Sequence, residues 1–110
     1  MGISTHILDT SRGKPAKGVT VRLEQVVGMA TTELAQGVTN DDGRVKPLLE
    51  TIPMKGTFRL HFEVAPYFNA LGVETFFPSV FIDFVVKDVN EHYHVPLLLN
   101  PFGYSTYRGS

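Results

Sequence analysis

The chain alternates between apolar and polar residues over several short stretches. This is typical of β-strands, because successive side chains of a strand point to opposite faces of a sheet. Residues 19–25 and 57–64 show the alternation most clearly, and each stretch predicts a strand with one buried face. The residues expected to face inward are Val19, Val21 and Leu23 in the first stretch and Phe58, Leu60, Phe62 and Val64 in the second.

Residues 80–87 depart from this pattern because both faces of the predicted strand carry apolar side chains. One face holds Val80, Ile82, Phe84 and Val86, and the other holds Phe81 and Val85. Such a strand is expected either at the centre of a sandwich or at a contact between subunits. The chain has eight Phe and four Tyr, more aromatic side chains than a small core requires, and this excess favours the subunit contact.

Turn signals divide the rest of the chain into short segments. Clusters of Gly, Pro, Asn and Asp lie at residues 9–18, 40–44 and 53–56. A short helix is predicted over residues 66–72, where Pro66 suits a helix start and Gly72 a helix end. With about eight short strands and one brief helix, the chain is predicted to fold as an antiparallel β-sandwich. Its length is that of one domain, so residues 1–110 are expected to form a single core.

Composition and charge exclude several classes of function. Hydrophobic residues make up 43% and charged residues 19% of the chain, which is typical of a globular protein. The formal net charge is -1 without a basic block, so a nucleic-acid partner is not expected. The chain has no cysteine, which excludes disulfides, thiolate zinc sites and a cysteine nucleophile. No signal-like or membrane-spanning apolar stretch is present, so we expect a cytoplasmic protein without membrane contact.

The four histidines are the side chains whose ordinary pKa lies near neutrality. His6 falls in the first predicted strand, where a single histidine is more often structural than catalytic. His92 and His94 are two residues apart and share a strand face. Such a pair can bind a metal, but no nearby Cys or carboxylate cluster supplies a third ligand. Without a metal, His92 is expected to be a surface residue or one that supports a neighbouring side chain. His61 lies on a polar face, so we expect it to be solvated.

The C-terminal tail is unusual because two tyrosines and an arginine occur in the last seven residues. Chain ends usually fray and rarely carry packed aromatic side chains. Taken alone, this tail predicts a closing edge strand with a short disordered end, and Arg44 is by similar reasoning a solvated turn residue. The chain has no GxGxxG, P-loop, HExxH or GxSxG motif, which disfavours nucleotide binding and serine hydrolysis through a nucleophile elbow.

Three segments together resemble the transthyretin-related proteins and, among them, the 5-hydroxyisourate hydrolases. They are THILDTSRGKPA at residues 5–16, DDGR at 41–44 and HYHVPLLLNPFGYSTYRGS at 92–110. The resemblance is most specific in the final tetrapeptide, Tyr-Arg-Gly-Ser. This tetrapeptide and the histidines in the first strand and in HxHVPLL separate the hydrolases from the carrier transthyretin, which is alike in fold but lacks them. Asn100 stands where Ser is commoner in the family, and no chemistry rests on it.

The resemblance implies a transthyretin-like antiparallel sandwich of eight strands in two four-stranded sheets, with one short helix. It also implies a homotetramer, a dimer of dimers, whose active sites lie in a channel at the dimer-dimer interface. The strand faces expected to line that channel carry Ser4, His6 and Leu8, His92, His94, Pro96 and Leu98, and Ser105 and Tyr107. The strand at 80–87 then becomes the expected neighbourhood of the dimer edge.

The reaction implied by the resemblance is hydrolysis of an amide-type bond of 5-hydroxyisourate. The product is 2-oxo-4-hydroxy-4-carboxy-5-ureidoimidazoline in urate degradation, and no metal or organic cofactor is implied. The resemblance assigns water activation and proton return to His6 and His94. Arg44 and Arg108 are expected to bind the substrate's carbonyls and its developing negative charge, and Arg44 is also counted as catalytic. Tyr107 and Ser110 are expected to shape and close the pocket.

Two other classes of function are weighed against this hydrolase. A transthyretin-like carrier would bind a small aromatic ligand in the channel, although two histidines and the Tyr-Arg tail would make that channel polar and partly blocked. A plain β-sandwich adhesion module would fit a secreted protein. The match over nearly the whole chain and the absence of a signal peptide argue against it.

Overall fold

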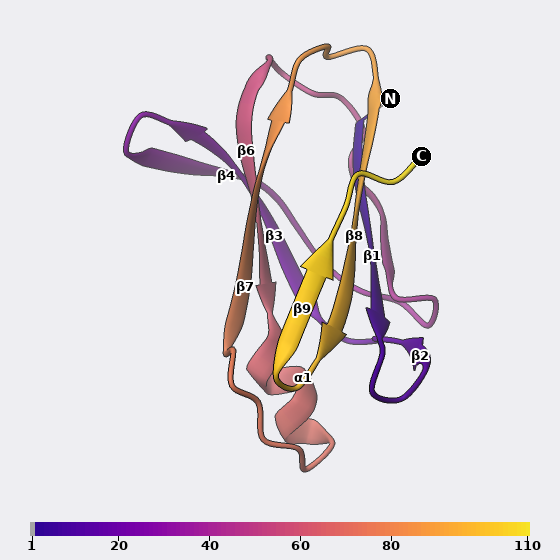
Figure 1. Ribbon diagram of the computed structural model, residues 1–110. Coiled ribbons are helices and arrows are strands. Elements are labelled where there is room, and N and C mark those ends of the chain that lie inside the picture. The colour runs from indigo at the N-terminus through magenta and orange to yellow at the C-terminus, as the bar shows by residue number, and fades with distance from the viewer. Residues whose placement is uncertain (1) are drawn as a thin grey trace.

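The computed structural model describes residues 2–110 and shows two β-sheets packed face to face (Figure 1). The first sheet has the order β2-β1-β8-β9, and β5 pairs with β1 beside β2. Its strands are β1 (Gly2–Asp9), β2 (Lys14–Pro15), β5 (Arg44–Leu49), β8 (His92–Asn100) and β9 (Gly103–Thr106). The second sheet has the order β4-β3-β6-β7. Its strands are β3 (Thr20–Val27), β4 (Ala30–Val38), β6 (Gly56–Glu63) and β7 (Ser79–Val86).

The predicted sandwich of two sheets with one short helix is confirmed, with two differences in detail. The two-residue β2 adds a short fifth strand to the first sheet, because residues 14 and 15 return alongside the end of β1. The β1–β8 pair is parallel, whereas the other pairs in both sheets are antiparallel. The chain between β1 and β8 passes through the second sheet before it returns, and a connection of that length permits parallel pairing.

The core lies between the sheets and contains the residues that alternation placed there. Phe58, Leu60 and Phe62 of β6 are fully buried, as are Val21 and Leu23 of β3. The first sheet contributes further fully buried side chains, namely Ile3, Ile7 and Leu97. Each such side chain contributes about 1.5–3 kcal/mol on burial. Packing of this inner face leaves the alternate residues of β1 and β8 on the outer face of the first sheet.

Helix α1 (Val64–Ala70) begins two residues earlier than the predicted start at Pro66. The N–H groups of Val64 and Ala65 donate to the carbonyl of Pro78, 3.1 and 3.0 Å away, and this turns the chain as soon as β6 ends. Pro66 is therefore the third helical residue, where the missing N–H still costs no intrahelical bond. Among residues 2–110, no helix is long and apolar enough to cross a membrane.

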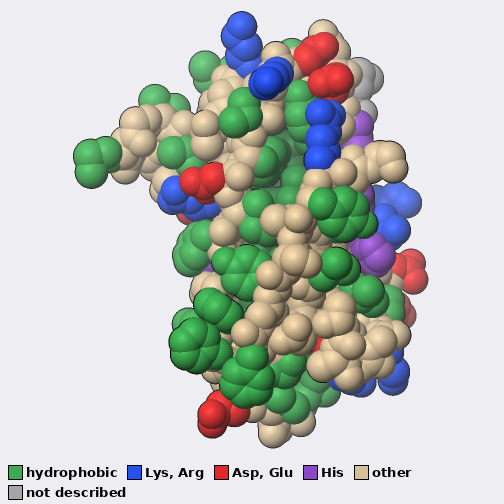
Figure 2. Space-filling model, viewed as in Figure 1, with side chains coloured by type: hydrophobic (Ala, Val, Ile, Leu, Met, Phe, Trp, Pro, Cys, Tyr) green, Lys and Arg blue, Asp and Glu red, His purple; other side chains and the backbone are tan. Residues whose placement is uncertain are grey.

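Strand β7 lies at an edge of the second sheet, so its two apolar faces do not reflect a central position. Phe81 and Val85 are 54% and 57% exposed on its outer face. Other exposed aromatic side chains include Phe76, Phe102 and Tyr104. Hydrophobic side chains gather on the face that carries the β7 and β9 edges (Figure 2). The aromatic excess thus lies partly outside the core, and its role in a subunit contact stays a prediction.

Candidate active site

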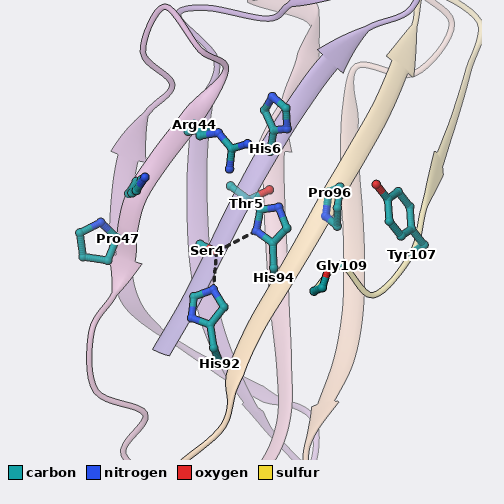
Figure 3. Close-up of a pocket in the computed structure, with 12 residues that line it drawn as sticks. Ser4, Thr5, His6, Arg44, Pro47, His92, His94, Pro96, Tyr107 and Gly109 are labelled. Carbon is teal, nitrogen blue, oxygen red and sulfur yellow. Dashed lines mark hydrogen bonds between the residues drawn. The ribbon is translucent and has the colours of Figure 1, made fainter. Parts of the chain in front are cut away.

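A cavity of about 690 Å³ lies on the outer face of the first sheet. Strands β1, β5 and β8 form its floor and walls, together with the tail that follows β9 (Figure 3). Histidine side chains show at the β1–β8 margin of the molecule in Figure 2. The lining residues are Ser4, Thr5, His6, Arg44, Lys46, Pro47, His92, His94, Pro96, Tyr107, Gly109 and Ser110.

A tight turn places Arg44 beside His6. The side-chain Oδ1 of Asn40 accepts hydrogen bonds from the N–H groups of Asp42 and Arg44, at 2.9 and 3.1 Å. Gly43 has a φ of 74°, and a Cβ there would lie 2.4 Å from the carbonyl oxygen of Ile7, so the turn requires glycine. Arg44 then opens β5 directly opposite His6. It is half-buried in the cavity wall rather than a solvated turn residue.

Parallel pairing of β1 with β8 brings Ser4 opposite His94. The Ser4 Oγ lies 2.7 Å from Nδ1 of His94 and 2.9 Å from Nε2 of His92. Figure 3 shows this hydroxyl between the two rings, with the Arg44 side chain reaching from β5 toward His6 and His94. The cavity therefore holds three imidazoles and one guanidinium on neighbouring strands.

The tail does not end as a frayed strand but continues alongside β8 in the register of the β8–β9 pair. The Gly109 N–H donates to the His94 carbonyl at 2.8 Å. A Cβ at position 109 would lie 2.6 Å from Cδ2 of the His94 ring, so any larger residue would displace that ring. Tyr107 and Ser110, on either side of it, line the cavity.

Arg108 points away from this cavity. Its guanidinium lies over the Tyr93 ring, 4.5 Å from the ring centroid, and Nη2 donates to the His92 carbonyl at 3.4 Å. Nη2 is also 3.8 Å from a carboxylate oxygen of Glu91. Arg108 lines a separate cavity of about 330 Å³ with residues of β7. Its predicted contact with substrate thus has no support from this placement, and the role stays a prediction.

Burial and positive charge favour the neutral form of two cavity histidines. The pKa of His94 is lowered by burial and then by Arg44, His92 and His6. The pKa of His6 is lowered by burial and then by Arg44. Both imidazoles are therefore able to accept a proton at neutral pH. Within residues 2–110, no three or more His, Cys, Asp or Glu side chains are grouped so as to hold a metal ion.

Residues 3–109 match the HIUase/Transthyretin family. The chain belongs to this family. A 5-hydroxyisourate hydrolase of Salmonella dublin is 49% identical over 109 residues, which cover 98% of this chain and 80% of the relative. The Klebsiella pneumoniae 5-hydroxyisourate hydrolase structure has a TM-score of 0.83 and 42% identity, covering 98% of this chain and 92% of that one. A sea bream transthyretin in complex with thyroxine has a TM-score of 0.92 and 28% identity, covering 99% and 95%.

Within this family member, the cavity brings together five of the residues predicted from the sequence, namely His6, Arg44, His94, Tyr107 and Ser110. Ser4, His92 and Pro96, on the strand faces expected to line the channel, line the cavity as well, whereas Leu8 and Leu98 of the same faces do not. The polar lining residues Thr5 and Lys46 were not among those predicted. The alternation contains a signal for Lys46, which lies two positions from Arg44 and so shares its face.

Proposed function

We propose that this protein hydrolyses 5-hydroxyisourate to 2-oxo-4-hydroxy-4-carboxy-5-ureidoimidazoline in urate degradation. One observation carries the proposal, which is that two histidines with lowered pKa lie beside one arginine in a single cavity. The choice of substrate is supported by relatives such as the Salmonella dublin protein, which is 49% identical in sequence and is named a 5-hydroxyisourate hydrolase. The proposal needs neither a metal nor an organic cofactor, because the cavity already holds groups that move protons and groups that bind oxyanions.

In the proposed reaction, a cavity histidine accepts a proton from water as the water oxygen attacks a ring carbonyl. The ring C–N bond then breaks, and its nitrogen leaves with a proton returned by an imidazolium. We assign these proton transfers to His94 and His6, whose lowered pKa keeps each in the accepting form. A positioned general acid or base typically contributes about 10² to 10⁴ in rate.

Arg44 is assigned to the oxyanion that forms on the attacked carbonyl and to substrate binding. Its planar guanidinium offers paired donors and does not lose its charge near neutrality. Tyr107 and Ser110 are assigned to shaping and closing the cavity that they line. Arg108 is kept in the proposal as a substrate-binding residue, which requires its side chain to leave Tyr93.

We also propose a homotetramer, a dimer of dimers, with active sites at the dimer-dimer interface. The cavity lies on an outer sheet face, where His92, Lys46 and Tyr107 are all exposed in the single chain. A second copy that faced this sheet would cover the cavity and exclude water from it. Light scattering tests this, because the tetramer has four times the mass of the chain and a monomer at working concentration would contradict it.

The function is tested with freshly generated 5-hydroxyisourate. Its ultraviolet absorbance should decay faster than the spontaneous rate, and the product should be a single enantiomer. The alternative, a transthyretin-like carrier, is favoured by the likeness to thyroxine-bound sea bream transthyretin. Thyroxine is therefore titrated in parallel. Tight thyroxine binding with no acceleration of the decay would favour the carrier and reject the hydrolase.

The rate is expected to depend on pH through the two histidines. Their lowered pKa values mean that each imidazole becomes half-protonated only below the ordinary value of 6.5. The kcat/KM should therefore be flat near neutrality and fall as the pH drops, with a midpoint below 6.5, since the accepting form is lost there. His61 also has a lowered pKa but lies in the second sheet, so His61→Gln should keep the same profile. A midpoint above 6.5 would contradict the assignment.

Replacing Arg44 by Lys is expected to lower kcat/KM by about 10- to 100-fold. Lysine keeps the charge but cannot present two parallel donors to one substrate group. The matched control is Arg59→Lys, because Arg59 makes a two-bond ion pair with Asp83 in the second sheet. Steady-state kinetics on both variants measures the difference. Equal activity of the two would remove Arg44 from the chemistry.

A further inference from the structure

The Ser4 hydroxyl has two ring nitrogens within hydrogen-bond distance and only one proton to donate. Oγ lies 2.7 Å from Nδ1 of His94 and 2.9 Å from Nε2 of His92. If Ser4 donates to one ring, it must accept from the other, because a hydroxyl carries a single O–H. The three groups therefore form a chain with two possible directions, and each direction fixes the tautomer of both histidines.

The His94 ring is held on two sides, which leaves one nitrogen free. Its Nδ1 faces Ser4, and its Cδ2 edge abuts the backbone of Gly109, where a Cβ would lie 2.6 Å away. The remaining nitrogen, Nε2, is the one left to meet a water or substrate in the cavity. The ring therefore cannot flip to exchange its nitrogens without breaking the Ser4 contact.

The direction of this chain of hydrogen bonds decides whether His94 accepts or donates a proton at Nε2. When Nδ1 of His94 carries the proton and donates to Ser4, Nε2 has a free lone pair and can act as a base. Ser4 then donates to Nε2 of His92. His92 is exposed, so its Nδ1 can hold a proton and donate it to solvent.

We propose that Ser4 and His92 are positioning residues that hold His94 as the Nδ1-protonated tautomer, with Nε2 free to act as the base. This inference rests on the proposed function for its kinetic consequence, but the tautomer itself does not depend on any substrate. Ser4 is the central member, because it is half-buried between the strands and touches both rings. The exposed His92 is the outer member, and water can partly replace it.

The tautomer is tested first in the unaltered protein, by nitrogen-15 NMR of its histidine side chains above pH 7. A protonated Nδ1 and an unprotonated Nε2 on His94 are the expected result. The reverse assignment, or rapid averaging of the two nitrogens, would overturn the inference. Because this measurement needs no substrate, it stands even if 5-hydroxyisourate is not hydrolysed, and that failure would count against the proposed function alone.

Ser4→Ala and Ser4→Thr form a matched pair for the kinetic test, since Thr keeps the hydroxyl and suits a strand. Ser4→Ala should lower kcat by about 10- to 100-fold with little change in KM, and the His94 nitrogens should average. Ser4→Thr should restore both the rate and the tautomer. His92→Ala should cost less than Ser4→Ala, and His92→Gln, which offers an acceptor oxygen, should recover that loss. A wild-type rate and tautomer in Ser4→Ala would contradict the inference.

Discussion

Replacing His94 by Asn is expected to lower kcat by about 10³-fold while the sandwich stays folded. The loss follows from the removal of the proposed base, since an amide does not accept a proton near neutrality. Stability should change little, because His94 lies on the outer face of β8 and its neighbours Val95 and Tyr93 form the core side. The decay of 5-hydroxyisourate absorbance gives the rate, and thermal unfolding followed by circular dichroism gives the stability.

The matched control for His94→Asn is His61→Asn, a half-buried strand histidine that stacks on Phe81 at 4.3 Å. It should keep full activity. His6→Asn should also lower the rate strongly, and the double variant shows whether the two histidines act as one unit. A double variant no slower than either single one indicates a shared step. Full activity in both single variants would remove the histidines from the mechanism.

Deleting residues 107–110 is expected to abolish measurable turnover, with a loss of at least about 100-fold, without unfolding the protein. The deletion removes Tyr107 and Ser110 from the cavity wall and the Gly109 backbone from the edge of His94. The sandwich should survive because the tail lies outside the core, and Tyr107 is 58% exposed. Kinetics and circular dichroism on the truncated chain measure the two effects separately.

A second tail variant keeps the length of the chain and separates backbone from side chains. Tyr107→Gly combined with Arg108→Ser retains Gly109 and its bond to the His94 carbonyl. This double variant should keep the His94 ring in place but lose whatever rate the two replaced side chains contribute.

For the deletion of residues 107–110, an undiminished rate would place the tail outside the active site.

Much of the fold could be predicted because the central strands β3 and β6 each bury one face. The alternation in β3 and β6 placed Val21, Leu23 and Phe58 in the core, and all three are fully buried. The same alternation set the outward side chains of β1 and β8 on one surface, which is why His6 and His94 meet in one cavity. These predictions succeed because side-chain direction in a strand is a local property.

Contacts that depend on the register between distant strands could not be predicted in the same way. Ser4 meets His94 only because β1 and β8 pair in parallel with Ser4 opposite His94, and no pattern within either strand encodes that offset. Arg108 is a different case. The His94–Gly109 bridge keeps the register of β9 on β8, so Arg108 alternates with Tyr107 and faces the opposite side, where its guanidinium packs on Tyr93. Its predicted substrate contact came from the family resemblance and not from the strand pattern.

The parallel β1–β8 pair also sets the order in which the first sheet can be completed. Ser4 and His94 are 90 residues apart, so during synthesis β1 waits without this neighbour until nearly the whole chain has emerged. Contacts between residues so far apart in sequence form slowly, because the entropy cost of closing the long loop comes before the contact can stabilise it. The second sheet, whose strand neighbours β3, β4, β6 and β7 all lie between these partners in sequence, can form before the first sheet closes. We therefore expect the outer face of the first sheet to be among the last parts of the molecule to assemble, so that a newly made chain acquires its cavity only at the end of folding.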